Sequence, residues 1–292
     1  MRAIGLVGIL VLALASDIAI AASWPNHGIG GKRKNLIPAK WFTDYPAPTI
    51  ANPTTDPCVA AVGRLTIGRY NVGTAELVLN RREVLTSTIV ASQDRVVFRL
   101  GYIRRTWSLA TWGTVVARGS AYVDQYKNMH NLASGDWAII VLDKGARATV
   151  NPMDIYPGSA ISSTNLASFL AIVGYPVGFP QAKVPTTEVP IIAAGCDIAG
   201  VDANHLLLHT CGADHGSSGG PIFMRLDDGS CQVVGIQILV NPEGALYAPY
   251  KREIANGAVP AESFRWAALK VQQLLEAGET ADQIKAEYGK KW

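Results

Sequence analysis

The stretch Cys211-Gly-Ala-Asp-His-Gly-Ser-Ser-Gly-Gly-Pro221 is the most informative part of the sequence. Its glycines and its proline let the backbone turn sharply around Ser218, which exposes the hydroxyl of that residue. The same turn directs the backbone amides of Gly216 and Ser218 towards one point, where they can stabilise a developing oxyanion. A serine followed by one glycine is a common turn, whereas this complete run between two apolar segments is far more specific.

Short β-type segments surround this run and extend over most of the chain. They are rich in β-branched residues, they alternate, and turn residues separate them. The first set comprises Val62 to Ile67, Ala75 to Leu79, Glu83 to Thr86, Arg95 to Leu100, Thr114 to Arg118 and Trp137 to Leu142. The second set comprises Leu170 to Val173, Val189 to Ala193, His205 to His209, Pro221 to Met224, Gln232 to Leu239 and Gly257 to Pro260. Two sets of about six strands predict an all-β protein with a barrel or sandwich architecture.

The C-terminal tail, residues 263–292, changes to a helical period. Ser263 is placed to cap a helix that Gly278 ends, and Thr280 with Gln283 forms a capping box for a short last helix. The apolar face of the first helix comprises Phe264, Ala267, Ala268, Val271, Leu274 and Leu275. We expect this face to pack against the β-structure.

The composition fits a folded protein rich in turns. The chain has 292 residues, of which 49% are hydrophobic and 17% are charged, with 28 glycines and 16 prolines. This composition argues against disorder over most of the chain and against a long coiled coil. The net charge of +3 gives no basic footprint for a nucleic acid. The one basic cluster, residues 32–34, is interpreted as a solvated loop or a processing site.

The N-terminal residues have the pattern of a secretory signal peptide. Met1 and Arg2 form a short positive end, an apolar run extends from Ile4 to Ala15, and small residues precede a cleavage point after Ala21. Residues 22–56 follow as a Pro/Gly-rich linker or pro-segment. No segment is long and apolar enough to span a membrane. We therefore expect a secreted or periplasmic protein.

Four cysteines in an exported chain favour disulfides, because their spacing matches no zinc site. Four cysteines allow three pairings, and the sequence alone does not choose among them. The preferred pairing joins Cys196 to Cys211, which flank one strand-like segment, and by elimination Cys58 to Cys231. The alternative is that one pair or both stay reduced.

The run from Gly216 to Pro221 resembles the nucleophile motif of the trypsin-like serine endopeptidases, particularly their bacterial exported branch. The resemblance extends from about Pro57 to Phe264. It implies two six-stranded antiparallel barrels, at about 57–148 and 149–262, with the site in the cleft between them and the helical tail at 263–292. It also implies that Ser218 is the nucleophile and that the amides of Gly216 and Ser218 form the oxyanion hole.

Two further motifs of the family are present, and one departs from its pattern. Asp136, which precedes an apolar strand, matches the orienting carboxylate. The segment from Glu83 to Val90 matches the lead-in to the catalytic histidine, but Ile89 occupies the histidine position. Without an imidazole to accept the serine proton, attack on an amide is severely slowed.

The resemblance also indicates the substrate-binding residues. Gly212 matches the bottom of the specificity pocket, His215 lines the entrance, and Gln237 replaces the histidine of glutamate-specific relatives. The strand that pairs with extended substrate continues through Ile238, Leu239 and Val240. With no acid at its base, the pocket is predicted to be neutral rather than selective for Lys or Arg.

The leading hypothesis is an exported trypsin-like protease homologue that binds polypeptide between its barrels with impaired or absent hydrolysis. The alternative is an active serine endopeptidase that uses Ser218 with a non-standard base, for which His215 is one candidate. A β-barrel module unrelated to proteolysis would explain the strands but not the run from Gly216 to Pro221. No cofactor, metal or nucleic-acid partner is expected, and no oligomeric state is predicted.

Overall fold

A computed structural model of the chain describes seven stretches that all belong to one compact unit, residues 35–292. These stretches are residues 49–67, 70–120, 133–158, 170–176, 188–202, 205–240 and 255–289. The expected leader, most of the linker with its basic cluster, His27 and His130 lie outside them. No helix in these stretches is long and apolar enough to cross a membrane.

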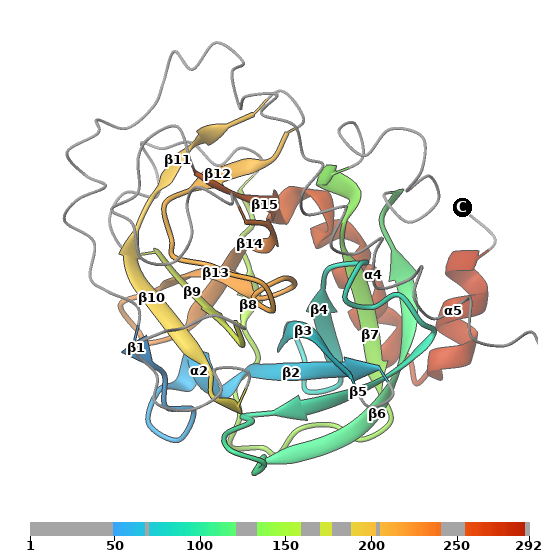
Figure 1. The fold of residues 1–292 in the computed structure, drawn as a ribbon. Coiled ribbons are helices and arrows are strands. Elements are labelled where there is room, and N and C mark those ends of the chain that lie inside the picture. Colours follow the sequence, from blue (N-terminus) through green and yellow to red (C-terminus); the bar gives the residue numbers. More distant parts are fainter. Residues whose placement is uncertain are drawn as a thin grey trace, which may run out of the picture. The chain divides into compact units, whose positions relative to one another are not determined.

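The first half of the unit is a closed antiparallel barrel (Figure 1). Its strands follow the order β2-β3-β4-β7-β6-β5. Their bounds are β2 (Val62–Ile67), β3 (Tyr70–Leu77), β4 (Glu83–Thr86), β5 (Arg95–Leu100), β6 (Leu109–Arg118) and β7 (Ala138–Leu142). Phe98 fills the interior opposite Gly63, where a Cβ would lie 2.4 Å from the Phe98 ring. This close approach explains a glycine in the middle of a strand.

The second half is a nine-stranded sheet in the order β1-β10-β9-β13-β14-β15-β12-β11, with β8 paired to β14. The bounds are β1 (Thr49–Ile50), β8 (Asp154–Ile155), β9 (Leu170–Gly174), β10 (Ile191–Cys196), β11 (Ile198–Val201), β12 (Leu207–His209), β13 (Pro221–Arg225), β14 (Cys231–Leu239) and β15 (Asn256–Pro260). Only Asp197 separates β10 from β11, so the two are halves of one bent strand. One half pairs with β9 and the other with β12, which curls the sheet back on itself. The predicted all-β, two-barrel fold is confirmed.

The helices within the described stretches are few and short. They are α2 (Pro57–Ala60), the 3-10 turns η3 (Ala133–Gly135) and η7 (Ala261–Ser263), α4 (Arg265–Glu276) and α5 (Ala281–Gly289). The expected cap at Ser263 is wrong, because this residue belongs to η7 and α4 begins after Phe264 without a side-chain cap. Gly278, with φ +86°, does follow the end of α4, and the capping box of Thr280 and Gln283 is present.

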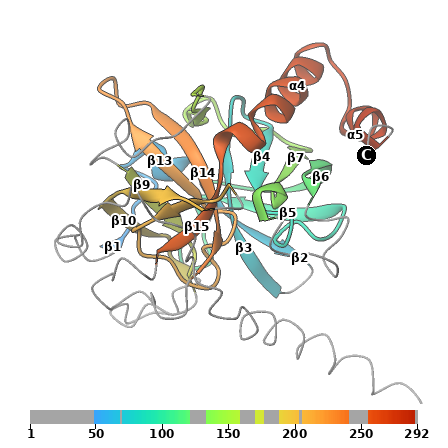
Figure 2. The same cartoon turned by 90° about the horizontal axis from the view of Figure 1, so that it is seen from above.

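The two C-terminal helices cover the outside of the first barrel, where α4 packs on β4 and α5 on β6 (Figure 2). The expected apolar face of α4 is buried from Ala267 to Leu274. The Tyr288 hydroxyl joins α5 to α4 by donating a hydrogen bond to the Ala267 carbonyl at 3.0 Å. The tail is therefore an integral layer of this fold.

Two disulfides cross-link the fold, one between residues far apart in the chain and one over a separation of 15 residues. They join Cys58 to Cys231 and Cys196 to Cys211, the pairs preferred from the sequence. The first closes a separation of 173 residues and ties α2, before the first barrel, to the start of β14 in the second. No free cysteine occurs in the part of the chain that the structure describes. Disulfides of this kind are typical of oxidising compartments.

Two glutamates on neighbouring strands are buried without full hydrogen bonding. Neither carboxylate oxygen of Glu76 has a partner, and Glu83 accepts one hydrogen bond, from Asn80 at 3.0 Å. Burial raises the pKa of both carboxyls well above the ordinary 4.5. In register, Glu76 lies opposite Val62 and Leu85, two buried apolar side chains. A leucine at position 76 would fit these neighbours.

We expect Glu76→Leu to stabilise the protein by about 1–3 kcal/mol at neutral pH, because it removes an uncompensated buried carboxyl. Because the folded-state pKa of Glu76 is raised, this residue lowers the free energy of unfolding increasingly as the pH rises above 4.5. The stabilisation by Glu76→Leu will therefore be larger at pH 8 than at pH 4. Urea unfolding at both pH values measures it. Glu262→Leu, at an exposed position, is the matched control. Equal effects of the two substitutions would contradict the prediction.

Candidate active site

The loop that carries Ser218 connects β12 to β13 and depends on two glycines. Gly216 has φ +91° and Gly219 has φ +79°, a region that favours glycine. A Cβ on Gly216 would lie 2.3 Å from the Tyr175 carbonyl oxygen, and one on Gly219 would lie 2.1 Å from the Thr86 hydroxyl. Both glycines are therefore required by conformation and by space.

Thr74, on β3 of the first barrel, fastens this loop. Its amide donates to the Ser218 carbonyl at 3.0 Å, and its hydroxyl donates to the Gly216 carbonyl at 2.8 Å. The same hydroxyl accepts from the amide of Tyr175 at 3.0 Å. The sequence analysis missed Thr74, which follows the strand glycine Gly73. A Cβ at Gly73 would lie 2.8 Å from the Ser218 carbonyl oxygen, so this glycine is the sequence signal of the close approach.

Two amides of the loop are free to bind an anion. The amides of Ser217, Gly219 and Gly220 donate to carbonyls within the fold, at 2.7–2.9 Å. Among the described residues, the amides of Gly216 and Ser218 and the Ser218 hydroxyl have no hydrogen-bond partner. Ser218 is half-buried. These groups could hold an oxyanion beside a serine hydroxyl.

Asp136 and Ile89 lie together on the first barrel. The amide of Ile89 donates to Asp136 Oδ1 at 3.2 Å, and the Thr88 hydroxyl donates to the Trp137 carbonyl at 2.8 Å. Asp136 is 5% exposed, whereas Ile89 is 64% exposed. The turn that begins at Thr86 thus touches Gly219 at one end and Asp136 at the other. The side chain at position 89 starts beside the carboxylate but offers it no polar atom.

Burial raises the pKa of Asp136 from 3.8 to about 6, although hydrogen bonds from the Ile89 and Thr88 amides oppose the shift. Such a carboxylate is partly desolvated, as an orienting carboxylate must be. Because its folded-state pKa is raised, its contribution to stability falls as the pH rises from 3.8 to about 6.

The Asp136→Asn variant keeps an oxygen acceptor for the Ile89 amide but does not ionise. We expect it to be more stable than the unaltered chain above pH 6, by up to about 3 kcal/mol, and equally stable below pH 4. Urea unfolding across this pH range is the measurement. Asp227→Asn, at an exposed position, controls for the loss of one charge. A stability difference between Asp136→Asn and the unaltered chain that stays constant at all pH values would contradict the assignment.

The structure describes three histidines, and none of them hydrogen-bonds to Asp136 or Ser218. His215 and His205 are exposed, while His209 is fully buried on β12. Within the described stretches, no cluster of three His, Cys, Asp or Glu side chains could bind a metal ion. The candidate site therefore has a serine, a loop with two free amides and a carboxylate, and none of the described histidines lies between the serine and the carboxylate.

Gln237, one of the predicted substrate-binding residues, is a buried polar residue of β14 behind the serine loop. The amide of Gly219 donates to the Gln237 carbonyl at 2.7 Å, so the loop and β14 are joined. Gln237 is fully buried, and its Nε2 donates to the Leu239 carbonyl at 2.8 Å. Asn256 is buried opposite His209 and donates to the Cys211 carbonyl at 2.9 Å, which holds the start of the loop beside half-buried Gly212. The sequence analysis missed Asn256, because no local motif marks it.

Burial lowers the pKa of His209 from 6.5 to about 4, and the nearby Gln237 side chain offsets only part of this. Neither ring nitrogen of His209 nor Gln237 Oε1 has a partner in hydrogen-bonding geometry. The imidazole is therefore neutral at pH 7.

We expect His209 to destabilise the fold by up to about 3 kcal/mol as the pH falls from 6.5 to 4, because the unfolded chain takes up a proton that the folded chain does not. Asp136 changes the stability in the opposite direction over nearly the same pH range, because its contribution rises as the pH falls. The contributions of His209 and Asp136 to the pH dependence of stability therefore largely cancel. His209→Leu will remove this loss of stability at low pH, while His205→Gln will not. Urea unfolding at pH 4 and pH 6.5 is the measurement. A pH profile unchanged by His209→Leu would refute the assignment.

The chain matches no protein-family model and no curated protein. It is similar to a solved structure of a Glu endopeptidase in complex with MPD, with 18% identity and a TM-score of 0.56 over 78% of this chain and 99% of that chain. It is also similar to neuropsin, a serine protease expressed in the limbic system of mouse brain, with 17% identity and a TM-score of 0.56 over 77% of this chain and 98% of that chain. The chain thus has the two-barrel fold of the chymotrypsin-like serine proteases.

Proposed function

We propose that this chain is an exported homologue of the trypsin-like serine proteases that binds polypeptide between its barrels and hydrolyses it poorly or not at all. The observation that carries the proposal is Ile89, whose amide contacts Asp136 where the family places its histidine. Ser218 lacks a base among the described residues, although its loop retains the free amides. Loss of the histidine from a Ser-His-Asp triad lowers the rate of hydrolysis by a factor on the order of 10⁶.

Binding of an extended peptide is supported by the end of β14. Strand β13 pairs with β14 only as far as Pro221 opposite Ile236. Beyond that point Ile238, Leu239 and Val240 are partly exposed, and no described strand pairs with them on the side of β13. A peptide can add there as a strand, with the serine loop at its end. Gly212 brings no charge to this region, which supports a neutral side-chain preference.

An active endopeptidase with a non-standard base is the competing function. Its support is the serine loop, which keeps both required glycines and both free amides. Exposed His215 is one candidate for the base, yet it has no bond to Ser218 or Asp136. The two functions differ in the reactivity of Ser218, which can be measured directly.

Labelling with a serine-directed fluorophosphonate tests the proposal. The unaltered mature chain is expected to label negligibly at neutral pH. Ile89→His places an imidazole beside Asp136, and we expect it to raise the labelling rate by about 10²–10⁴-fold, the usual contribution of a general base.

Ser218→Ala in both backgrounds shows that the label is on this serine, and Ile89→Gln is the control for any polar residue at position 89. Rapid labelling of the unaltered chain, abolished by Ser218→Ala and by His215→Gln, would establish the active endopeptidase instead. Peptide mapping of the labelled protein identifies the modified residue in each case.

A further inference from the structure

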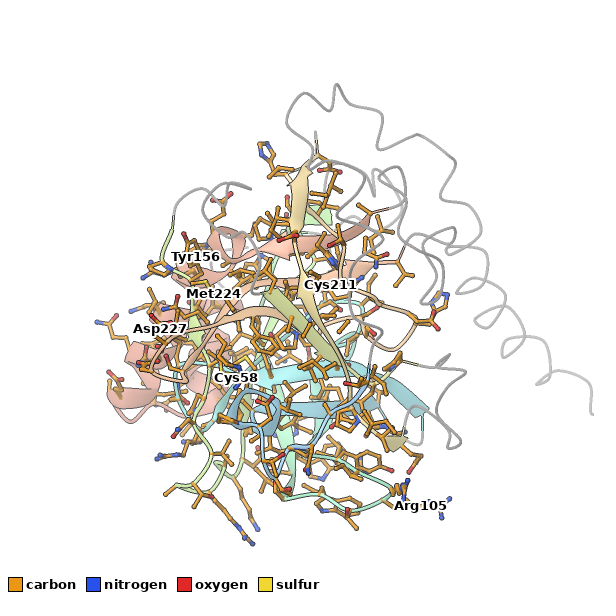
Figure 3. All side chains as sticks on the ribbon, turned by 90° about the vertical axis from the view of Figure 1, so that its left-hand side faces the viewer. Cys58, Arg105, Tyr156, Cys211, Met224 and Asp227 are labelled. Atoms are coloured by element: carbon orange, nitrogen blue, oxygen red, sulfur yellow. A yellow bond between two sulfur atoms is a disulfide. The ribbon has the colours of Figure 1, made fainter. Side chains whose placement is uncertain are left out.

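The turn between β5 and β6 has a conformation that its residues do not favour. Arg104 and Arg105 follow each other with φ +45° and +67°, although neither is a glycine. Such strain persists only where the surroundings impose it, and it is common at binding sites. Here the Arg104 amide donates to the Glu188 carbonyl at 2.6 Å. The turn holds both arginine side chains in solvent, and Figure 3 shows Arg105 at the lower edge of the view, directed away from the ribbon.

Behind the arginines is a layered stack of rings and guanidinium groups. Trp107 stacks on Tyr102 with ring centroids 6.2 Å apart and planes 6° from parallel. The guanidinium of Arg64 lies 4.6 Å from the centroid of Tyr102, and that of Arg99 lies 5.7 Å from Trp107. Trp107 is 47% exposed although it is stacked. A large, fixed indole is thus presented to solvent between arginines.

The charge of this surface is not balanced. Glu188 is occupied, because it accepts from Arg64 at 3.4 Å and from the Tyr102 hydroxyl at 2.8 Å. Arg99 donates to the Thr66 hydroxyl at 2.6 Å. No carboxylate of the described chain pairs with Arg99, Arg104 or Arg105. We call Arg99, Arg104, Arg105 and Trp107 the Trp107 face.

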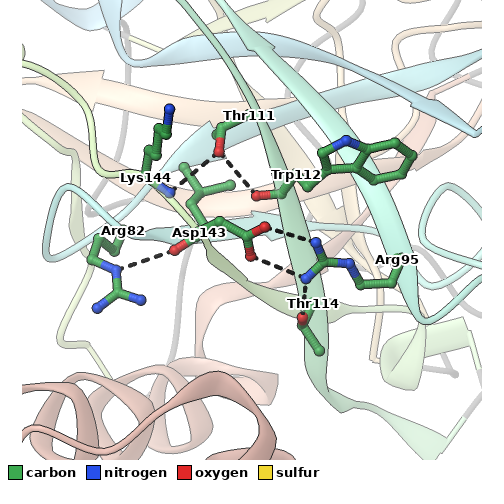
Figure 4. A network of polar contacts seen from close by, with 8 residues as sticks. Arg82, Arg95, Thr111, Trp112, Thr114, Asp143 and Lys144 are labelled. Carbon is green, nitrogen blue, oxygen red and sulfur yellow. Dashed lines mark hydrogen bonds and ion pairs between the residues drawn. The ribbon is translucent and has the colours of Figure 1, made fainter.

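A second exposed tryptophan on the same barrel provides a contrast (Figure 4). Trp112 is 50% exposed and lies 5.8 Å from the guanidinium of Arg95. This arginine, however, forms two hydrogen bonds with Asp143, at 2.7 and 3.0 Å, and one with Thr114. The charge at Trp112 is therefore neutralised within the fold, and that at the Trp107 face is not.

We propose that the Trp107 face binds an acidic segment of polypeptide. Its carboxylates would pair with Arg104 and Arg105, and an apolar side chain would cover the exposed indole of Trp107. Guanidinium groups bind carboxylates through two parallel hydrogen bonds, and a tryptophan between arginines is a typical centre of an interface. The turn already fixes the backbone of both arginines, so binding orders their side chains but not the turn itself.

The choice of polypeptide as the occupant rests on the proposed function, because the face is connected to the candidate cleft. Tyr102, beneath Trp107, makes an edge contact with Tyr175 at 6.1 Å. A Cβ on Gly216 would lie 2.3 Å from the Tyr175 carbonyl oxygen, so Tyr175 lies directly against the serine loop. Two ring contacts, one of them to the fully buried Tyr175, thus connect the Trp107 face to the serine loop through the protein interior. A polypeptide is therefore the occupant that fits both this face and the proposed function.

Fluorescence anisotropy with two labelled peptides tests this proposal on the full chain. One peptide is rich in glutamate and aspartate with a few leucines, and its counterpart has glutamine and asparagine instead. We expect the acidic peptide to bind at least about tenfold more tightly at low salt and to lose this advantage as the salt concentration rises. Arg104→Glu with Arg105→Glu, and separately Trp107→Ala, should each weaken the acidic peptide by about tenfold or more.

Trp112→Ala and Arg147→Glu are the matched controls, and both should leave the affinity for the acidic peptide within about twofold. Thermal unfolding of each variant confirms that it is folded. Equal binding to the unaltered chain and to the double arginine variant would overturn the proposal. So would binding of a sulfated oligosaccharide at these residues without binding of the acidic peptide.

The counterpart peptide separates this proposal from the proposed function. Its binding reports on the cleft, so failure of this peptide alone would contradict peptide binding between the barrels. Failure of the acidic peptide alone would contradict the Trp107 face.

Discussion

The hydrogen bonds of one threonine set the geometry of the candidate site. Thr74 belongs to the first barrel, yet its amide and hydroxyl hold the carbonyls of Ser218 and Gly216 in the second. The Thr86 hydroxyl in turn bonds the Thr74 carbonyl at 2.7 Å. The residues joined by the Thr74 hydroxyl are 142 and 101 positions away from it in the chain. The shape of the serine loop is therefore a property of both folded barrels together.

Ile89 takes no part in these contacts, which explains how the site keeps its form without an imidazole. Its amide retains the bond to Asp136, and its side chain extends into solvent, so no core packing depends on which side chain is present. The contacts that shape the serine loop and the side chain at position 89 are thus physically separate. The geometry of the loop can persist whether or not the chain hydrolyses anything.

The features predicted correctly from the sequence are those that neighbouring residues encode, namely most of the strands and the serine loop. Alternation located most strands, but β6 begins at Leu109, earlier than expected, because Ala110 and Gly113 weaken the pattern there. The glycine run located Ser218, whereas Thr74 and Asn256 act across the fold and leave no local signal of their own. Polar Glu76 and Glu83 lie in strands where an exposed face is expected, yet both are fully buried. The site roles of Asp136, Ile89 and Ser218 remain predictions from motifs, which the geometry supports.

The bend at Asp197 influences the order in which the parts of the fold unfold. The sheet of the second half closes only through the chain that continues from β10 into β11, and the Cys196–Cys211 disulfide crosses this seam beside the serine loop. The first barrel closes by continuous strand pairing and has no such seam. We therefore expect loss of this disulfide to loosen the seam before the first barrel opens, so that amide hydrogens of β11 and β12 exchange before those of β4 and β7. Redox conditions thus reach the candidate site before they reach the rest of the fold.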